Sequence, residues 1–187
     1  MTSFYTPEEL KLIPFQSVGE NVLISRKASI YSPGSITIGS NVRVDDFCIL
    51  SGKIYVGNNV HIAAQSVLYG GIAGITINDF ANISSRVAIY AISDDYSGLT
   101  MTNPTIPDKF KQIQNEPVTI GKHVIIGTGC TVLPGVFIAE GTALGAMSLC
   151  KTTTKPWMIY CGIPAKVLKD RKRNLLKLEK EYLNEHY

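Results

Sequence analysis

The sequence predicts an all-β fold, a parallel β-helix of short stacked coils, and two observations support this prediction. Aliphatic residues recur every six positions, a spacing that fits neither an α-helix nor the simple alternation of a strand. A small or turn-forming residue follows many of these anchors, and a second small or β-branched residue lies four positions after an anchor. The anchors are Ile38, Val44, Leu50, Val56, Ile62, Leu68, Ile77, Ile83, Ile89, Ile120, Ile126, Val132, Ile138, Leu144 and Cys150.

A chain that turns every six residues needs sharp corners, and glycine at a corner tolerates the positive φ that strains other residues. Three such corners close one coil of about 18 residues, which gives a triangular prism with the anchors stacked along its axis. One coil alone could not bury its apolar face, so we expect stacking between coils to supply the stability.

Length and composition bound the function. The chain has 187 residues, 45% hydrophobic content and a net charge of +3 that comes largely from the tail after Val167, which indicates one domain and no nucleic-acid-binding surface. The N-terminus lacks a basic stretch followed by a long apolar run, and the four cysteines form no C-x-x-C pair. We therefore expect a reduced, cytoplasmic protein that does not insert into a membrane.

Two flanking segments differ from the coils. Residues 1–35 are expected to cap the prism, and the order Thr6-Pro-Glu-Glu9 predicts a short helix with a capping box at the open end. Residues 168–187 are expected to form an amphipathic C-terminal helix with Leu175, Leu178 and Tyr182 on its apolar face.

The rhythm breaks at residues 92–117, in the segment ISDDYSGLTMTNPTIPDKFKQIQNEP. Its prolines prevent it from continuing the coil, and long excursions of this kind are usually functional or disordered. We expect a protruding loop that interrupts a single domain of coils running over residues 36–167.

The closing segment carries the most specific pattern. "VTIGKHVIIGTGCTVLPGVFIAEGTALGAMSLC" followed by "WMIYCGIPAKVLK" resembles the end of the hexapeptide-repeat acyltransferases, in particular the sugar N- and O-acetyltransferases of surface-polysaccharide biosynthesis. The resemblance implies a left-handed β-helix, acetyl-CoA as the donor, and a homotrimer in which the loop closes over sites shared between subunits.

The resemblance also implies where coenzyme A binds. In this family pantetheine runs along the outside of the coils and bonds to backbone groups near small-residue corners. The matching positions in this chain are Gly127, Thr128, Gly145 and Ala146. Lys166 of the G-x-P-A-K turn, with Lys151 and Lys169 as further candidates, is expected to meet the phosphates.

The acceptor site departs from the family pattern. Where O-acetyltransferases of this family carry a catalytic histidine, this chain has Asp94, followed by Asp95 and Tyr96 as candidates for acceptor binding. Of the two histidines in the body of the chain, His61 is the candidate for a site role, while His123 lies at a coil corner.

An aspartate in place of the histidine bears on whether the acceptor group is a hydroxyl or an amine. A sugar hydroxyl needs a general base with a pKa near the working pH, which favours histidine, whereas an ordinary aspartate is a weak base. A neutral amine is already a nucleophile and needs positioning, a nearby carboxylate and donors for the oxyanion. Asp94 therefore favours acetylation of an amino group, most plausibly on a nucleotide-linked amino-deoxy sugar in the biosynthesis of O-antigen or another surface polysaccharide.

Three alternatives are weighed against this interpretation. An O-acetyltransferase stays open because two neighbouring carboxylates can raise one pKa, and His61 would then be the base. A non-catalytic β-helix that serves assembly would not need the acidic excursion or the closing turn. A metal site is not expected, because three converging histidines would be needed and the body of the chain has two.

Overall fold

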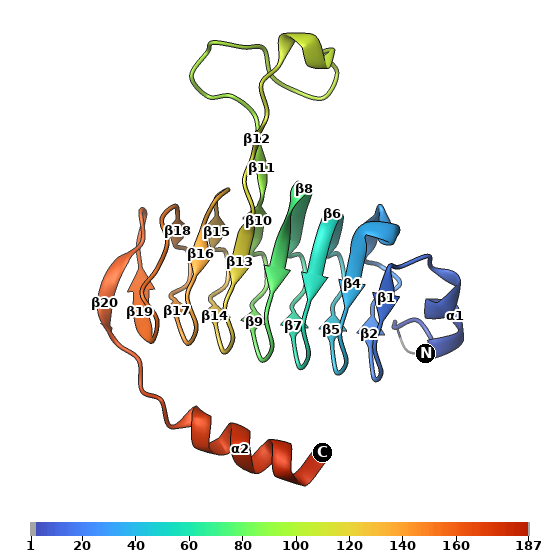
Figure 1. Cartoon of the computed structure of the whole chain (residues 1–187), viewed down its shortest axis with the longest axis vertical. Helices are drawn as coiled ribbons and strands as arrows, with labels where there is room; N and C mark the ends of the chain where they lie inside the picture. The colour runs from blue at the N-terminus through green and yellow to red at the C-terminus, as the bar shows by residue number, and fades with distance from the viewer. Residues whose placement is uncertain (1–2, 187) are drawn as a thin grey trace.

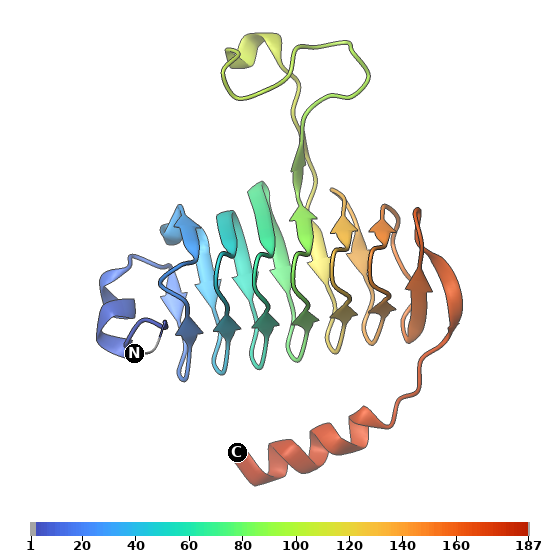
Figure 2. The same ribbon diagram turned by 180° about the vertical axis from the view of Figure 1, so that it is seen from behind.

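The computed structural model describes residues 3–186, and for His186 only the backbone. The expected cap and C-terminal segment also include residues 1, 2 and 187, which lie outside this range. The chain forms a left-handed parallel β-helix with a loop that projects from one edge and a helix at each end of the described chain (Figures 1 and 2).

The prism has three faces, each built from one short strand per coil. Face 1 consists of β3 (Ser29–Tyr31), the first half of β6 (Ile49–Val56), the first half of β8 (Val67–Ile77), β10 (Ala88–Tyr90), β15 (Thr131–Val132) and β18 (Leu149–Cys150). Face 2 consists of β1 (Ser17–Val18), β4 (Ile36–Ile38), the second halves of β6 and β8, β13 (Val118–Ile120) and β16 (Phe137–Ile138). Face 3 consists of β2 (Leu23–Ile24), β5 (Arg43–Val44), β7 (His61–Ile62), β9 (Asn82–Ile83), β14 (Ile125–Ile126), β17 (Ala143–Leu144) and β19 (Met158–Cys161).

Three edges join these faces. Corner A joins face 2 to face 3, corner B joins face 3 to face 1, and corner C joins face 1 to face 2, where β6 and β8 bend and the loop departs. Neighbouring coils pair in parallel, as in the register of Arg43 with His61 and of His61 with Asn82.

The residues of the six-residue repeat form the core, as predicted. Each of the fifteen anchors has at most 2% of its surface exposed, and the positions four residues later are buried with them, from Val42 and Cys48 to Thr142 and Ser148, except at the two breaks after Leu68 and Ile89. One fully buried aliphatic column therefore runs along the axis, and each coil covers the apolar side of the next.

Glycine at the corners has a different role from the one expected. The glycines that directly follow an anchor do not have positive φ; positive φ occurs two residues later, at Asn41, Asn59 and His123 along corner A. A Cβ on Gly121 would lie 2.6 Å from Glu140 N, and one on Gly127 would lie 2.5 Å from Ala146 N. These glycines are required because the backbone of the next coil passes too close for a side chain.

Three departures from the 18-residue coil locate the insertions, and the first is the offset of 20 residues between Ser17 and its partner Thr37. Ser40 N donates to Asn58 Oδ1 across 18 residues, and Asn58 N donates to Asp79 Oδ1 across 21, because β8 carries a bulge. The Thr128 hydroxyl reaches the Ser85 carbonyl across 43 residues, so the whole excursion lies within this one coil.

The N-terminal cap is shorter than expected. Helix α1 (Pro7–Leu12) has the predicted capping box, in which Thr6 and Glu9 each accept from the other's backbone N–H. Parallel pairing already begins with Ser17, which is in register with Thr37, whereas the coils were expected to start near residue 36. A single 3₁₀ turn, η1 (Pro33–Ser35), lies between the first two coils.

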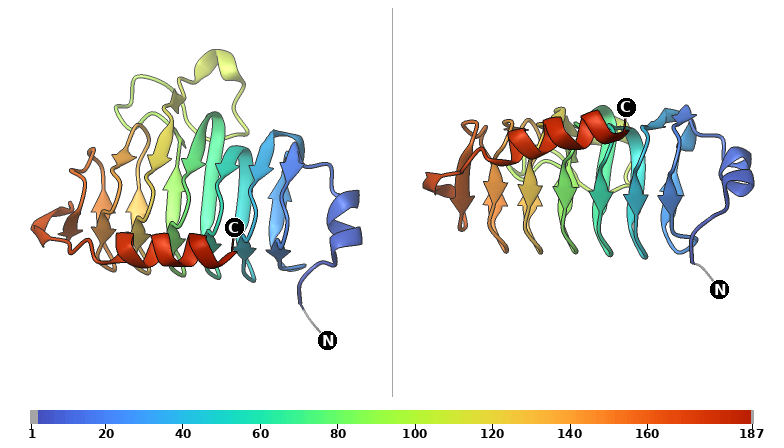
Figure 3. Two further views of the ribbon diagram at one scale, coloured as in Figure 1. Left: turned by 60° about the horizontal axis from the view of Figure 1, so that its bottom comes forward. Right: turned by 90° about the horizontal axis from the view of Figure 1, so that it is seen from below.

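The C-terminal segment divides into a strand and a helix. The chain first forms β20 (Lys166–Asp170), antiparallel to β19, and only then α2 (Leu175–His186), where a helix was expected from residue 168. Helix α2 returns along corner A towards the middle of the prism (Figure 3). Leu178 is 63% exposed, so the predicted apolar face is wrong at this position.

An ion cluster, and not Leu178, anchors α2 to the prism. Glu179 Oε2 lies 2.9 Å from His123 Nε2 and Oε1 pairs with Lys122 Nζ, and the Glu179 and His123 side chains are 10% and 7% exposed. Burial alone would raise the pKa of Glu179, but the hydrogen bonds from Lys122 and His123 outweigh it and lower the pKa below its ordinary value of 4.5.

This lowered pKa gives helix docking a defined pH dependence. Because the folded pKa lies below the unfolded one, the cluster stabilises the docked helix fully above pH 4.5 and loses that contribution as the pH falls through the folded value. Glu179→Gln should weaken docking at pH 7 by about 1.5–3 kcal/mol, measured as faster amide hydrogen exchange over residues 175–186. Glu185→Gln, on an exposed side chain of α2, is the control; equal exchange in the two variants would contradict the assignment.

Candidate functional site

Asp94 lies at the base of the projecting loop. Strands β11 (Ile92–Ser93) and β12 (Gln114–Asn115) pair antiparallel and form a stalk, and the loop above them contains one 3₁₀ turn, η2 (Asp108–Phe110). Asp94 directly follows β11 and is exposed. Within residues 3–186 its carboxylate has no hydrogen bond or ion pair, so it is available to a ligand.

Its neighbour Asp95 is committed to the loop. One carboxylate oxygen accepts from Ser97 N at 2.7 Å, and the other accepts from Thr100 N at 2.9 Å and from the Thr100 hydroxyl at 3.1 Å. The hydrogen bonds from Ser97, and then those from Thr100, lower the pKa of Asp95 to about 2. Asp95 therefore orders the loop, and both of its carboxylate oxygens are occupied by protein donors. Tyr96 is 94% exposed.

Corner B presents small residues and free backbone donors. Thr128 and Ala146 lie at equivalent places in successive coils, since Met147 N donates to Thr128 O at 2.8 Å. Among the described residues, neither the Thr128 N–H nor the Ala146 N–H donates to another group. Gly127 and Gly145 precede them; the close approach of the next coil explains Gly127, whereas a Cβ on Gly145 would lie 3.2 Å from the Cys161 Cβ. The expected donor positions thus form one continuous edge with unsatisfied amides.

Ser84 occupies the same edge one coil earlier, a position that we did not single out from the sequence. It follows β9, and its backbone N–H donates to Ile126 O at 3.0 Å, which fixes the backbone. Its side chain is half-buried, and in the described part of the chain its hydroxyl has no partner. A free hydroxyl therefore lies on the same edge as the amides of Thr128 and Ala146, in register with Gly127.

The candidate lysines do not lie together at one corner. Lys166 on β20 pairs with Cys161 at corner B, Lys169 pairs with Ile159 on face 3, and Lys151 follows β18 at corner C. All three side chains are exposed, and none of them forms an ion pair in the described structure. They remain predictions for phosphate contacts.

His61 is engaged at both ring nitrogens. Nε2 lies 2.8 Å from Asp45 Oδ2, and Nδ1 lies 3.2 Å from Asn82 Oδ1. Because an ionised carboxylate only accepts, Nε2 carries the proton that faces Asp45. No ring nitrogen is left to accept a proton from a substrate hydroxyl, so this geometry does not support His61 as a general base.

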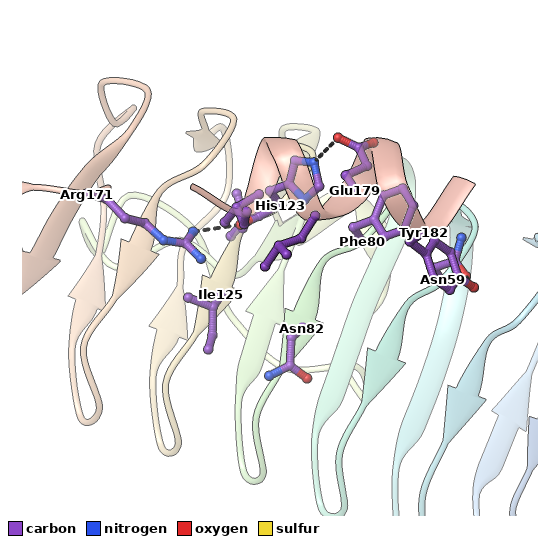
Figure 4. A pocket seen from close by; sticks show the side chains of 11 residues that line it. Asn59, Phe80, Asn82, His123, Ile125, Arg171, Glu179 and Tyr182 are labelled. Carbon is purple, nitrogen blue, oxygen red and sulfur yellow. Dashed lines mark hydrogen bonds and ion pairs between the residues drawn. The ribbon is translucent and has the colours of Figure 1, made fainter. Parts of the chain in front are cut away.

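A groove of about 410 Å³ separates α2 from face 3 (Figure 4). His123 and Glu179 form its ion pair on the helix side, and Phe80 and Tyr182 pack edge to face at 6.1 Å. Asn82 lines the other side, on the strand that leads to Ser84. The groove thus lies between the docked helix and face 3, and Ser84 is not among the residues that line it.

One chain does not bring Ser84 and Asp94 together. Ser84 lies at corner B, β10 then crosses all of face 1, and Asp94 follows only after corner C. The two free polar groups are therefore at opposite edges of one face. Within residues 3–186, no group of three or more His, Cys, Asp and Glu side chains is arranged to hold a metal ion, and neither helix is long and apolar enough to cross a bilayer.

Comparison with known proteins relates the chain to sugar acyltransferases. A family model described as bacterial transferase hexapeptide (six repeats) matches residues 35–70. The dTDP-4-amino-4,6-dideoxy-D-glucose acyltransferase of Escherichia coli is 48% identical over 174 residues, which cover 91% of this chain and 90% of that protein. The putative lipopolysaccharide biosynthesis O-acetyl transferase WbbJ of Escherichia coli K12 is 31% identical over 155 residues, 75% of this chain and 74% of that one.

Solved structures of AntD, an N-acyltransferase from Bacillus cereus, match almost end to end. The structure of its D94A variant with dTDP and coenzyme A has a TM-score of 0.97 and 54% identity, and covers 99% of this chain and 100% of AntD. An S84A variant was solved with dTDP-4-amino-4,6-dideoxyglucose and coenzyme A, and AntD itself with dTDP and 3-hydroxybutyryl-CoA. This chain has an aspartate and a serine at the same two numbers.

Proposed function

Because this chain belongs to the hexapeptide-repeat acyltransferases, we propose that it transfers an acyl group from coenzyme A to the amino group of a dTDP-linked 4-amino-4,6-dideoxy sugar. The observation that carries the proposal is the unpaired Asp94 carboxylate at the loop base, where an amine can be held. The acceptors and donors of the E. coli relative and of AntD support the same substrate classes.

The reaction needs little acid–base chemistry from the protein. The neutral amine nitrogen attacks the thioester carbonyl carbon, a C–N bond forms, the C–S bond breaks, and the thiolate of coenzyme A leaves with the proton lost by nitrogen. Asp94 orients the neutral amine and stabilises the positive charge that develops on its nitrogen as the C–N bond forms. The Ser84 hydroxyl, in line with the donor edge, is proposed to donate towards the reacting centre.

We propose that the working enzyme is a homotrimer with sites between subunits. Ser84 and Asp94 are at different corners of one chain, so a complete site takes its donor edge from one subunit and its loop base from the next. Exposed apolar side chains along corner B, Phe47 at 58% and Met147 at 66%, support a subunit contact beside this edge. This arrangement also covers coenzyme A on both sides.

The cellular setting is part of the proposal. The WbbJ relative supports a role in surface-polysaccharide biosynthesis. Free, buried Cys48, Cys130 and Cys150 support a reducing compartment such as the cytoplasm.

O-acetylation is the second candidate function, because the WbbJ relative is a putative O-acetyl transferase. It is disfavoured because both nitrogens of His61 are engaged by protein groups. One experiment separates the candidates: the protein is incubated with acetyl-CoA and, in parallel, with the dTDP-linked 4-amino and 4-hydroxy forms of the same 6-deoxy sugar. Mass spectrometry should find an amide product from the amino form. An ester from the hydroxy form, without the amide, would overturn the proposal; 3-hydroxybutyryl-CoA tests acyl length.

The donor path leads to a separate prediction. Ala146→Phe places a ring over the free amides of corner B, so the apparent KM for acetyl-CoA should rise at least tenfold while the fold is kept. Glu140→Phe puts the same ring on an exposed position of corner A in the same coil and should leave this KM unchanged. A well-folded Ala146→Phe protein with the wild-type KM would remove the assigned path.

A further inference from the structure

Arg86 is a basic residue of corner B whose guanidinium has no protein partner. It lies two residues after Ser84, in the left-handed region with a φ of 60°, and its backbone N–H donates to Ala64 O at 3.0 Å, which fixes it at the corner. The side chain is exposed, and within residues 3–186 it forms no hydrogen bond or ion pair. A fixed backbone thus presents a free cation next to the hydroxyl assigned to the reacting centre.

The basic side chains that precede Arg86 on the same corner are already neutralised. Arg26 donates from both terminal nitrogens to the Glu9 carboxylate, each at 2.6 Å, and Lys27 Nζ lies 2.9 Å from Asp46 Oδ2. In the described part of corner B up to β10, Arg86 is therefore the basic side chain that is left for an external anion. A guanidinium is also the side chain whose fork of donors matches two phosphate oxygens.

Both proposed substrates carry phosphates, and the geometry of the edge favours the acceptor. The donor edge continues from Ser84 to Thr128 and Ala146, one and two coils later, with about 4.8 Å between coils. When its thioester is at Ser84, coenzyme A therefore has its pantetheine arm over these coils and its phosphates beyond them. In a dTDP-linked 4-amino sugar, the amine on C4 and the diphosphate on C1 lie across a single pyranose ring, which an extended arginine side chain can span.

We propose that Arg86 binds the diphosphate of the nucleotide-linked acceptor and thereby selects this acceptor over a free amino sugar. The inference rests on the proposed function. The contact is a charge-assisted hydrogen bond between guanidinium and phosphate, among the stronger kinds in proteins. Because Arg86 holds the sugar at C1 while Asp94 holds the amine at C4, the ring is fixed at both ends.

The first test compares two acceptors, the dTDP-linked amino sugar and its methyl glycoside, which lacks the diphosphate. Arg86→Met should lower kcat/KM for the dTDP-linked acceptor about 10- to 100-fold, the size of a hydrogen bond to a charged group, mainly through a higher acceptor KM. It should leave kcat/KM for the methyl glycoside and the KM for acetyl-CoA unchanged. Arg86→Lys, which keeps the charge, should regain part of the loss.

Two outcomes of these kinetics would overturn the inference. An equal loss with both acceptors would mean that Arg86 acts on the sugar or on Asp94 and not on phosphate. A higher KM for acetyl-CoA with an unchanged acceptor KM would assign Arg86 to coenzyme A. Lys11→Met, which removes an exposed positive charge from α1 at the far end of the prism, is the control and should match wild type with both acceptors.

A binding measurement without turnover separates this inference from the proposed function. The Kd of dTDP, measured by titration calorimetry, should be about 10- to 100-fold higher for Arg86→Met than for wild type, and added salt should weaken binding to wild type more than to the variant. Equal dTDP affinity in the two proteins would overturn the inference. Wild-type protein that shows this difference but forms no amide product would instead overturn the proposed function and leave the phosphate contact in place.

Discussion

Asp94→Asn protein is expected to fold and bind coenzyme A normally but to lose about 10²–10⁴-fold in kcat/KM for the amino sugar. Asparagine keeps the shape and one carbonyl acceptor, yet it has no charge to hold an ammonium or to stabilise positive charge on nitrogen. Because the Asp94 carboxylate has no partner in residues 3–186, its loss leaves no buried group unsatisfied. Steady-state kinetics with circular dichroism of the same sample would separate chemistry from folding.

Two loop variants are controls for Asp94. Asp108→Asn, in η2 and with a side chain 96% exposed, should be near wild type. Asp95→Asn should lose less than Asp94→Asn, because an amide oxygen can still accept from Ser97 N or Thr100 N in the turn. If Asp94→Asn were near wild type while His61→Asn abolished turnover, the amine mechanism would be wrong and His61 would serve a hydroxyl acceptor.

The coil architecture was predictable because it depends on a repeated local rule. Each anchor meets the same environment in every coil, so the periodicity alone located the core column from Ile38 to Cys150. The excursion was equally visible, since the break in the rhythm after Ile89 coincides with the departure of β11. For such a fold, a sequence repeat therefore predicts the core residues more directly than the secondary-structure propensities of single residues do.

The function of the corner glycines could not be predicted from the repeat. Positive φ and close approach both select glycine, and only the structure shows that Gly127 faces the backbone of Ala146 while positive φ falls on residues such as Asn59. The start of the coils was missed for a different reason. The first coil keeps the six-residue spacing at Val18, Ile24 and Ile30, but two extra residues at η1 separate this series from Ile38.

The candidate site was predicted in part. Asp94 was located because it stands where the resembled family has a histidine, but Ser84 has no such marker in Ile83-Ser-Ser-Arg86. Its significance appears only when the coils are stacked and it falls on the same edge as Thr128 and Ala146. The docking of α2 through Glu179 also depends on tertiary contact, because helical periodicity cannot show that a carboxylate meets a buried histidine from another coil.

The shared site gives the second prediction with a large effect. Ser84→Ala and Asp94→Asn proteins should each be nearly inactive, but trimers assembled from both chains should recover activity. A site that takes Ser84 from one chain and Asp94 from the next is intact whenever the first chain is the Asp94→Asn variant and the second the Ser84→Ala variant. In a ring of identical contacts this holds for one site of the three in every mixed trimer, so a recovery of about one third is expected per site.

Co-expression of the two variants with different affinity tags, followed by tandem purification, would supply the mixed trimers, and their kcat per site measures the recovery. Trimers that carry Ser84→Ala and Asp94→Asn in every chain are the matched control and should stay inactive. A site built within one subunit predicts no recovery, because each chain of the mixture carries one defect. If the mixed trimers are as inactive as the control, the shared site is wrong. Because one chain holds Ser84 and Asp94 at opposite edges of face 1, the two residues would then have to act separately.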